Sequence, residues 1–356
     1  MIYFCLMCLC AFRQGSATLS PEAFLLETVE PNGEVVIGSN HAQLEGNKHG
    51  FEGGCAFRHE DGYHLFTAEM YGDPFWVAMR LGHWKSSDLR SWERVGTVFE
   101  SKGKGFEGDP KYSIWAPMPI YNEAEERWNL FYVCYRGAVT PEESTHMYGR
   151  IYRAASKVPG RGGLDGPYED VEVVMQPDAA SMAWEGQQGV DSFFPYKAGG
   201  RWFSHYGSHN YEPISFWRVG LASAPTLAGP WKRLPEHSPL AFEQEFIENP
   251  VLSRIGDYFV AVYDSSPIGP GKKYLGHPEN IGYSFSRDGV DWAPGRRLAI
   301  HSGHDANWAY DIRTPLGLIP LDTGKFAMLY TARDKAKPFW NVGLVEVRAK
   351  FKKTQD

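Results

Sequence analysis

The segment GHWKSSDLRSW at positions 82–92 recurs as GYSFSRDGVDW at positions 282–292. Both copies run from small residues into a Ser-x-Asp turn and end at a tryptophan. Looser copies occupy positions 152–168 and 220–231. In such a turn the Ser and Asp side chains bond nearby backbone amides, and the tryptophan fills the space between sheets. We therefore interpret Asp88 and Asp288 as structural residues within a repeated β unit.

This segment is the third part of a longer unit, and the first two parts of that unit occur five times. Each unit opens with a short apolar head segment and continues through a polar or glycine turn into a β-prone run, which is typical of a hairpin. The heads lie at 51–57, 113–120, 190–196, 247–252 and 311–319, and the runs at 63–68, 128–135, 202–206, 258–263 and 326–331. Heads spaced by roughly 60 to 75 residues leave room for a four-stranded blade and a loop. The sequence therefore predicts an all-β fold, a five-bladed β-propeller of four-stranded antiparallel blades.

The composition is that of a globular chain with enough apolar material for a core. Of 356 residues, 43% are hydrophobic and 22% are charged. The aromatic content of 15% suits both β interiors and sugar-binding clefts. A net charge of -7 gives no basic footprint, so we expect no nucleic acid partner. Beyond the first residues no apolar run reaches membrane-spanning length, so we expect no membrane association.

The first residues are typical of a short signal peptide. An apolar run over 1–9 is followed by the small residues Gly15, Ser16 and Ala17. We predict a signal peptide over 1–17, a single propeller domain over 18–356, and a secreted or periplasmic protein. A misassigned start codon and a disordered tail are the alternatives.

Two cysteines remain outside this leader, Cys55 and Cys134, and both fall in predicted strands. Two buried free thiols is the simpler interpretation, and one disulfide between neighbouring blades is the alternative. Neither cysteine has the spacing of a metal site, and we assign no metal ligand.

The heads of four units carry residues that resemble a known group of enzymes. The segments are Phe51-Glu52-Gly53, Ile114-Trp115-Ala116-Pro117, Val190-Asp191-Ser192 and Ile247-Glu248-Asn249-Pro250. Their order resembles the five-bladed propeller glycoside hydrolases typified by families 43 and 32 and related to family 117. The Trp-Ala-Pro at 115–117 is similar to family 43, and Glu248-Asn249-Pro250 is similar to the segment that supplies the general acid. Glu52 and Gly53 depart from the pattern, since these families usually have Asp followed by Pro.

Inner strands of a propeller converge on its axis, so we expect the head residues to share one pocket. Glycoside hydrolysis needs one protonated and one ionised carboxyl group, and a third can tune their pKa values. We assign Glu248 as general acid, Glu52 as base or nucleophile, and Asp191 as the orienting, pKa-raising partner. Asp109 is the alternative base. Each carboxylate also has a structural interpretation, in which it bonds backbone amides at a strand start.

The candidates for contact with substrate are Trp115, Asp109, His209, Arg313 and Asp311, with His304 as a further histidine. Trp115 is suited to stacking on a sugar face or to core packing. His209 is a candidate to hold a metal-bound water or donate a proton at the axis, as is His304. Arg313 is suited to binding sugar hydroxyls or a sugar carboxylate, although a buried ion pair with Asp311 is the interpretation we favour.

The resemblance implies a secreted, exo-acting glycosidase on plant or algal oligosaccharides or polysaccharides, with an arabinofuranoside or xyloside as the first candidate. A fructoside or an anhydrogalactose unit of red-algal galactan is the second enzymatic alternative. A non-catalytic carbohydrate-binding propeller is the third. No cofactor is required for this chemistry, and a structural calcium ion at the axis is left open. The sequence does not indicate the linkage, the stereochemical outcome or the oligomeric state.

Overall fold

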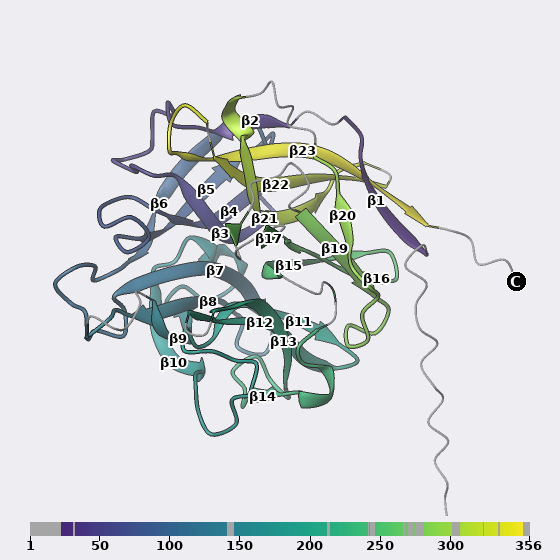
Figure 1. The fold of residues 1–356 in the computed structure, drawn as a ribbon. Coiled ribbons are helices and arrows are strands. Elements are labelled where there is room, and N and C mark those ends of the chain that lie inside the picture. Colours follow the sequence, from purple (N-terminus) through teal and green to yellow (C-terminus); the bar gives the residue numbers. More distant parts are fainter. Residues whose placement is uncertain are drawn as a thin grey trace, which may run out of the picture.

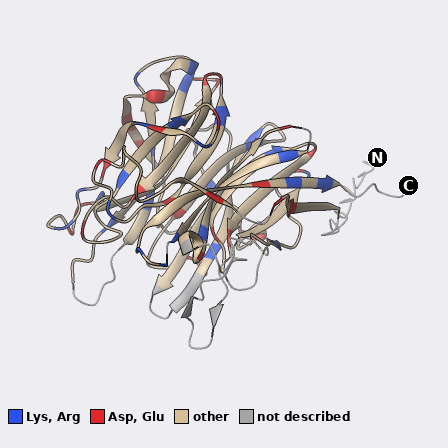
Figure 2. Cartoon of the chain, turned by 90° about the horizontal axis from the view of Figure 1, so that it is seen from above, with Lys and Arg blue, Asp and Glu red and all other residues tan. Residues whose placement is uncertain are grey.

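The computed structural model describes residues 23–30, 33–140, 146–211, 214–240, 242, 246–265, 268–269, 273–274, 281–300, 307–322, 324–333 and 335–351. The predicted signal peptide over 1–17 lies outside these residues and stays a prediction. Within the described ranges, no helix is both long and apolar enough to cross a bilayer. In the coloured part of Figure 2, Lys and Arg are interspersed with Asp and Glu along the blades.

The fold is a five-bladed β-propeller with antiparallel blades, as predicted (Figure 1). Blade one contains β3(Phe51–His59), β4(Gly62–Glu69), β5(Arg80–Ser86) and β6(Trp92–Glu100). Blade two contains β7(Ser113–Asn122), β8(Arg127–Arg136), β9(Met147–Ser156) and β10(Tyr168–Met175). Blade three contains β11(Asp191–Ala198), β12(Arg201–Tyr211), β13(Ile214–Ala224) and β14(Lys232–Arg233). Blade four contains β15(Glu248–Ile255), β16(Tyr258–Asp264), β19(Ile281–Ser286) and β20(Arg296–Leu298), with the small hairpin β17(Ile268–Gly269) and β18(Lys273–Tyr274) inserted between β16 and β19.

Blade five joins the two ends of the described chain. Its strands are β21(Asp311–Pro320), β22(Lys325–Arg333), β23(Trp340–Phe351) and β1(Phe24–Thr28), and β2(Glu34–Ile37) also pairs with β23. Phe24 lies opposite Phe351 in the β1–β23 register. Its buried ring packs against Tyr258 and Phe285 of blade four, with ring centroids 5.8 and 5.4 Å apart. The repeat pattern does not predict this closing strand, which precedes the first unit.

Each of the five predicted head segments forms the inner strand of a blade. These strands are β3, β7, β11, β15 and β21, and each contacts the next in a closed ring around the axis. The short helices η1(Arg161–Asp165), η2(Pro235–His237) and η3(Asn307–Ala309) lie in connections between strands. The sequence heads are therefore the elements that surround the central pocket.

The Ser-x-Asp turns have the structural role that the sequence predicted. The Asp88 carboxylate accepts the backbone N–H groups of Arg90 and Ser91 at 2.8 and 2.7 Å. Asp288 likewise accepts two backbone N–H groups, 2.8 and 2.9 Å away. Trp92 is buried and donates its indole N–H to the Leu89 carbonyl. These interactions close the turn between the third and fourth strands of blades one and four.

Cys55 and Cys134 are buried and unpaired, so the simpler prediction is confirmed and the disulfide alternative is wrong. Burial raises the pKa of Cys55 to about 12 and that of Cys134 well above its ordinary value. Both thiols therefore stay protonated and serve as small apolar side chains.

A bulge near the head of every inner strand turns one side chain toward the axis. The register shifts fall at Glu52/Gly54, Trp115/Met118, Asp191/Phe194, Glu248/Val251 and Ile312/Pro315. In four blades the residue directly after the side chain that points to the axis has a left-handed backbone. Its φ is 67° at Gly53, 49° at Ala116, 52° at Ser192 and 50° at Asn249. Bulges of this kind redirect a side chain beside an active site. The same kind of bulge therefore directs the side chains of Glu52, Trp115, Asp191 and Glu248 toward the axis.

The left-handed backbone explains why proline does not follow Glu52. Proline fixes φ near -65° and does not fit a φ of 67°. A Cβ added at Gly53 would lie 3.6 Å from the Ala116 Cα and 3.7 Å from Asn249 Oδ1, which is ordinary contact. Space therefore admits a small side chain at this position, and the backbone angle excludes proline.

We expect Gly53→Pro to destabilise the fold by more than about 2 kcal/mol, because the ring cannot adopt the native φ. Gly53→Ala is the matched control and should cost only about 1 kcal/mol, the strain of one non-glycine left-handed residue. Urea unfolding followed by tryptophan fluorescence measures both. Equal stability of the proline variant and the wild type would contradict this account of the bulge.

Candidate active site

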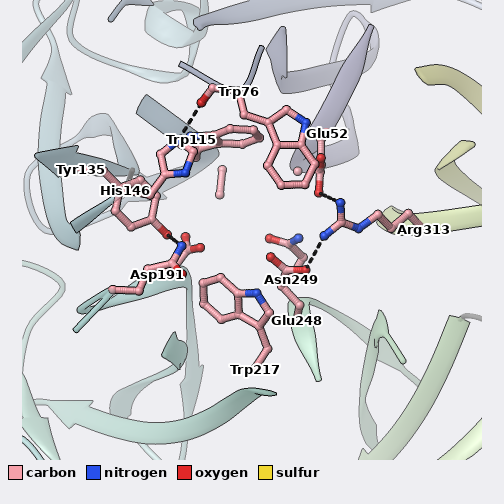
Figure 3. A pocket seen from close by; sticks show the side chains of 13 residues that line it. Glu52, Trp76, Trp115, Tyr135, His146, Asp191, Trp217, Glu248, Asn249 and Arg313 are labelled. Atoms are coloured by element: carbon pink, nitrogen blue, oxygen red, sulfur yellow. Dashed lines mark hydrogen bonds and ion pairs between the residues drawn. The ribbon is translucent and has the colours of Figure 1, made fainter. Parts of the chain in front are cut away.

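A pocket opens at the axis where the inner strands converge (Figure 3). It contains about 500 Å³ of empty space, its open mouth included. The lining residues come from several blades and are Glu52, Gly53, Trp76, Trp115, Ala116, Tyr135, His146, Gln188, Asp191, Trp217, Glu248, Asn249 and Arg313. The structure therefore brings together Glu52, Trp115, Asp191, Glu248 and Arg313, as predicted from the heads.

The guanidinium of Arg313 lies among three carboxylates. Its Nη1 is 3.1 Å from Glu52 Oε1, its Nη2 is 3.1 Å from Glu248 Oε2, and its Nε is 3.3 Å from Asp264 Oδ2. The indoles of Trp76 and Trp340 lie 5.2 and 5.9 Å from the guanidinium carbon, within cation–π range. Burial tends to lower the pKa of Arg313, but the surrounding carboxylates raise it above its ordinary value. Arg313 therefore stays charged and holds Glu52 and Glu248 at fixed positions.

The predicted pairing of Arg313 with Asp311 is wrong. Asp311 forms its ion pair with Arg333, whose Nη2 is 3.4 Å from Asp311 Oδ2, and it does not line the pocket. The two residues face each other in the β21–β22 register. Asp311 acts on the site only at a distance, since its charge helps to raise the pKa of Glu52.

Glu248 is the carboxyl group with the strongest tendency to keep its proton. It is 6% exposed. Burial raises its pKa well above the ordinary value, Arg313 opposes the rise, and the charges of Glu52, Asp264 and Asp191 add to it. This environment favours the protonated form, which is the state that a general acid requires.

The two carboxylate oxygens of Glu52 differ in their contacts. Its Oε1 pairs with Arg313, while Oε2 is buried and has no hydrogen-bond partner among the described residues. Burial raises the pKa of Glu52, Arg313 lowers it, and Asp311 raises it. Buried polar atoms are nearly always hydrogen-bonded, so Oε2 has the capacity to accept a bond from water or a ligand.

Asp191 is buried but well supplied with donors. The Tyr135 hydroxyl donates to its carboxylate, and the backbone N–H of Ser192 lies 2.5 Å from Oδ1. Burial raises the pKa of Asp191 to about 6; these two hydrogen bonds lower it and the charge of Glu52 raises it. Asp191 is therefore mainly ionised at pH 7, and its charge contributes to the raised pKa of Glu248.

Three tryptophans form the apolar part of the pocket wall. Trp115 meets Trp76 edge to face, with ring centroids 6.2 Å apart, and Trp217 lies across the pocket (Figure 3). Trp76 comes from the β4–β5 loop and Trp217 from β13. Sugar rings present apolar C–H faces, and flat aromatic surfaces suit them. Sequence reasoning identified Trp115 only, because the other two lie outside the repeated heads.

His146 is a further lining residue that the sequence analysis missed. Its Nε2 lies 2.6 Å from the Trp76 carbonyl oxygen, so Nε2 carries a proton and Nδ1 is the acceptor. Burial lowers its pKa to about 4, against the effect of this hydrogen bond. The ring is therefore neutral at neutral pH and fixed in one tautomer beside Trp115 and Tyr135.

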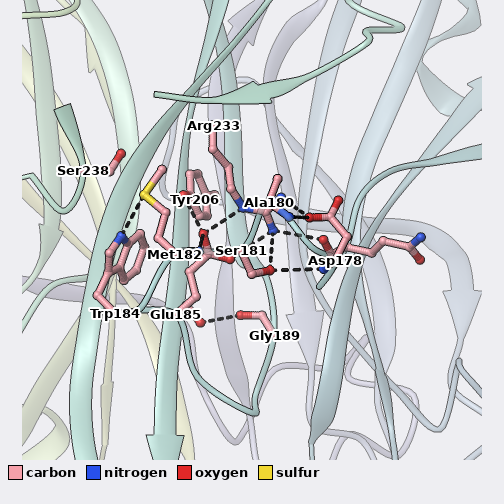
Figure 4. Close-up of polar contacts among 12 residues, drawn as sticks. Asp178, Ala180, Ser181, Met182, Trp184, Glu185, Gly189, Tyr206, Arg233 and Ser238 are labelled. Atoms are coloured by element: carbon pink, nitrogen blue, oxygen red, sulfur yellow. Dashed lines mark hydrogen bonds and ion pairs between the residues drawn. The ribbon is translucent and has the colours of Figure 1, made fainter. Parts of the chain in front are cut away.

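Gln188 lines the pocket and follows a segment that blade three anchors through Glu185 and Arg233. Figure 4 shows the contacts of that segment. Arg233 binds both carboxylate oxygens of Glu185, and the Tyr206 hydroxyl donates to the same carboxylate at 3.0 Å. Arg233 also binds Asp178 at 3.1 Å. This network pins the segment that leads from β10 into β11, and thus positions Gln188 next to Tyr135.

Besides Asp311, two predicted contact residues lie outside the pocket lining. Asp109 sits in a turn before β7, where its carboxylate accepts the Lys111 backbone N–H at 2.7 Å. His209 is buried behind the wall, with Nδ1 2.5 Å from Gln188 Oε1 and its ring stacked on Trp217. Both therefore act at most through their neighbours. His304 lies outside the described residues.

Asp264 is the acidic partner that sequence reasoning missed. It is fully buried at the end of β16 and lies opposite Glu248 in the β15–β16 register. A signal for it does exist, because second strands end in charged residues at Glu69, Arg136, Asp264 and Arg333. A charge at the end of an apolar strand needs a nearby partner.

The axis does not favour the calcium ion that the sequence left open. In the described ranges, donor groups close enough for a metal are His59, Asp61 and His64, and His64, His83 and Asp165, and none of them lines the pocket. At the axis the guanidinium of Arg313 already lies between Glu52 and Glu248. An axial calcium ion therefore stays a prediction without support from the donor geometry.

No protein-family profile and no curated protein sequence matches the chain. Solved structures match over most of its length. A protein described as a glycoside hydrolase is 18% identical, covers 93% of this chain and 96% of its own, and has a TM-score of 0.66. A family 117 glycoside hydrolase from the marine bacterium Zobellia galactanivorans is 13% identical, with coverages of 92% and 91% and a TM-score of 0.61. An exo-1,5-alpha-L-arabinanase from a bovine ruminal metagenomic library is 17% identical, with coverages of 84% and 93% and a TM-score of 0.54.

The chain thus has the fold of the five-bladed β-propeller glycoside hydrolases, and the resemblance noted in the unit heads is confirmed at the level of fold. At identities of 13 to 18%, these matches show the fold alone. The activity has to be argued from the pocket residues of this chain.

We expect Asp191→Asn to stabilise the protein above pH 6. The folded pKa of about 6 exceeds the usual 3.8, so the wild type loses stability as pH rises from 4 to 6 and carries the full cost above that range. This pKa shift corresponds to about 3 kcal/mol of unfolding free energy lost when Asp191 is ionised, and the neutral asparagine does not incur that loss. Urea unfolding at pH 4 and pH 7.5 measures the difference, which should be small at pH 4.

Asp88→Asn is the control of opposite sign. Backbone hydrogen bonds from Ser91 and Arg90 lower the pKa of Asp88 to about 2, so its charge stabilises the fold above pH 4. This variant should be less stable than the wild type at pH 7.5. If Asp191→Asn were also less stable there, the assigned environment of Asp191 would be wrong.

Proposed function

We propose that the chain is a glycoside hydrolase that removes terminal sugars from oligosaccharides. The observation that carries the proposal is the meeting of three buried carboxyl groups, Glu52, Asp191 and Glu248, in one pocket walled by tryptophans. Each is only 4 to 6% exposed. Hydrolysis of a glycosidic bond requires an acid and a base or nucleophile in separate environments, and this pocket offers both.

Glu248 acts as the general acid in this proposal and protonates the leaving oxygen as the glycosidic bond breaks. Glu52 activates a water molecule, or attacks the anomeric carbon, through the oxygen that Arg313 does not hold. Asp191 orients the sugar and keeps the pKa of Glu248 high by its negative charge. The distance between acid and base decides between inversion and retention, and proton NMR of the first-released anomer reads that outcome.

The charges of the pocket favour a neutral sugar. Arg313 is the cationic side chain among the lining residues, and all three of its nitrogens face carboxylates. A uronate or sulfated sugar would add negative charge to a site that already holds an excess of acidic groups. A sugar carboxylate is therefore disfavoured as a partner of Arg313.

The size of the pocket favours one sugar unit at a chain end. An arabinofuranoside or xyloside is the first candidate, and one structural neighbour is named as an exo-acting arabinanase. An anhydrogalactose unit of red-algal galactan, or a fructoside, is the second candidate. Secretion or periplasmic location belongs to the same proposal and rests on residues 1–17.

We expect Glu248→Gln to lower kcat by at least about 100-fold, because the amide has no proton to give to the leaving oxygen. Its affinity for the product sugar should stay within a few-fold of the wild type. A panel of arylglycosides and plant and red-algal oligosaccharides, read by product chromatography, identifies the substrate first. Calorimetry on both proteins then measures binding.

Asp109→Asn is the control, since Asp109 was the alternative base and lies outside the pocket lining. It should keep nearly full turnover. If the wild type releases no sugar from the panel but binds one of its members, the non-catalytic binding propeller becomes the better description. Full activity of Glu248→Gln would remove Glu248 as the acid.

A further inference from the structure

A second cluster of titratable side chains lies at the opposite end of β3 from Glu52. His59 ends β3, Asp61 lies in the turn, and His64 lies on β4. The length of the strand separates His59 from Glu52 by roughly 20 Å. This hairpin cluster, His59, Asp61 and His64, is therefore independent of the pocket and of the function proposed for it.

The three side chains converge on one carboxylate oxygen. His59 Nδ1 lies 3.1 Å from Asp61 Oδ1, and His64 Nε2 lies 2.8 Å from the same atom. All three donor atoms lie within 4.8 Å of one another. In a tetrahedral zinc site with bonds of 2.0 to 2.2 Å, neighbouring ligand atoms are about 3.3 Å apart. The two distances from the histidines to Asp61 lie within a few tenths of an ångström of that spacing, and the Asp61 side chain is half exposed.

The chemistry of the donors suits a transition metal. The three groups offer two imidazole nitrogens and one carboxylate oxygen, which are donor types that bind zinc. Two imidazoles and a carboxylate favour zinc over calcium or magnesium, which prefer oxygen ligands. The exposed side of Asp61 leaves room for a water ligand.

Surrounding residues already hold the histidine in a ligating orientation. His64 Nδ1 lies 2.9 Å from His83 Nε2, and the two rings are stacked. Burial lowers the pKa of His83 to about 3, so it is a neutral partner. Metal-binding histidines usually bond a second residue through their other nitrogen. The Nε2 of His59 is buried and unpartnered in the described part of the chain. In the present hydrogen bond to Asp61, His59 carries its proton on Nδ1. When the metal binds His59 Nδ1, that proton moves to His59 Nε2.

We propose that His59, Asp61 and His64 form a zinc-binding site in the β3–β4 hairpin. The metal takes the places of the two protons that now lie between the histidines and Asp61. The His59 proton moves to its Nε2, and the His64 proton moves to its Nδ1, where His83 Nε2 has to accept the hydrogen bond. It joins the two strands at the far end of blade one from the pocket. Lys85 competes with it, since its ammonium lies 2.5 Å from Asp61 Oδ2.

Calorimetric titration of the chelator-treated full chain with zinc chloride tests this site. We expect one zinc ion per chain and a Tm that rises with zinc concentration, whereas calcium and magnesium chloride should leave Tm unchanged. His59→Gln and Asp61→Asn should each weaken zinc binding at least tenfold. Lys85→Met should tighten it several-fold by removing the competing charge.

His49→Gln is the matched control. His49 Nε2 lies 2.9 Å from Asp73 Oδ1, and Lys48 lies 2.7 Å from Asp73 Oδ2, but no second histidine completes this group in the described residues. It should bind zinc as the wild type does. The proposal is overturned if the wild type shows no 1:1 binding, or if His59→Gln and Asp61→Asn, checked for folding by circular dichroism, bind zinc unchanged. Unchanged binding is the outcome expected if Cys5, Cys8 and Cys10 held the metal. If His59→Gln fails to fold, Asp61→Asn decides alone.

Discussion

One guanidinium among an excess of carboxyl groups is the constraint on which the central pocket depends. Arg313 comes from blade five, Glu52 from blade one, and Glu248 and Asp264 from blade four, so the charges tie three blades together. Buried charges are costly unless paired. One guanidinium cannot neutralise three carboxylates with Asp191 nearby, and the excess negative charge favours a proton on Glu248. The mutual repulsion of these carboxylates contributes to the raised pKa values of Glu52, Asp191 and Glu248.

The bulges in the inner strands direct one side chain of each strand toward the central pocket. An inner strand with regular pleating would turn alternate residues to its two faces. The left-handed residues Gly53, Ala116, Ser192 and Asn249 break that alternation at equivalent positions, and the hydroxyl of Ser192 donates to Asn249 at 3.0 Å. Strain of this kind concentrates at functional sites. In this fold it recurs around the pocket floor, which is where the head side chains must leave their strands.

Much of this arrangement could be predicted from the sequence, because repetition reveals which segments are inner strands. The five heads, the Ser-x-Asp turns and the pocket positions of Glu52, Asp191 and Glu248 follow from it. Pairing of charges could not be predicted in the same way. Asp311 and Arg313 stand two residues apart, yet the cross-strand register gives Asp311 to Arg333. Trp76 and Trp217 reach the pocket from a loop and a third strand, where no repeated signal marks them.

The pairing of β1 with β23 sets an order on the synthesis of the molecule. Residues 24–28 pair with 347–351, so the first described strand to leave the ribosome waits for the last before it finds its partner. Until then blade five lacks its outer strand and exposes an unpaired edge, which is a template for association with other chains. Contacts between such distant segments also slow folding. A newly made chain is therefore most prone to association with other chains where β1 pairs with β23. Conditions that prevent β1 from pairing with another chain before β23 is made reduce this association.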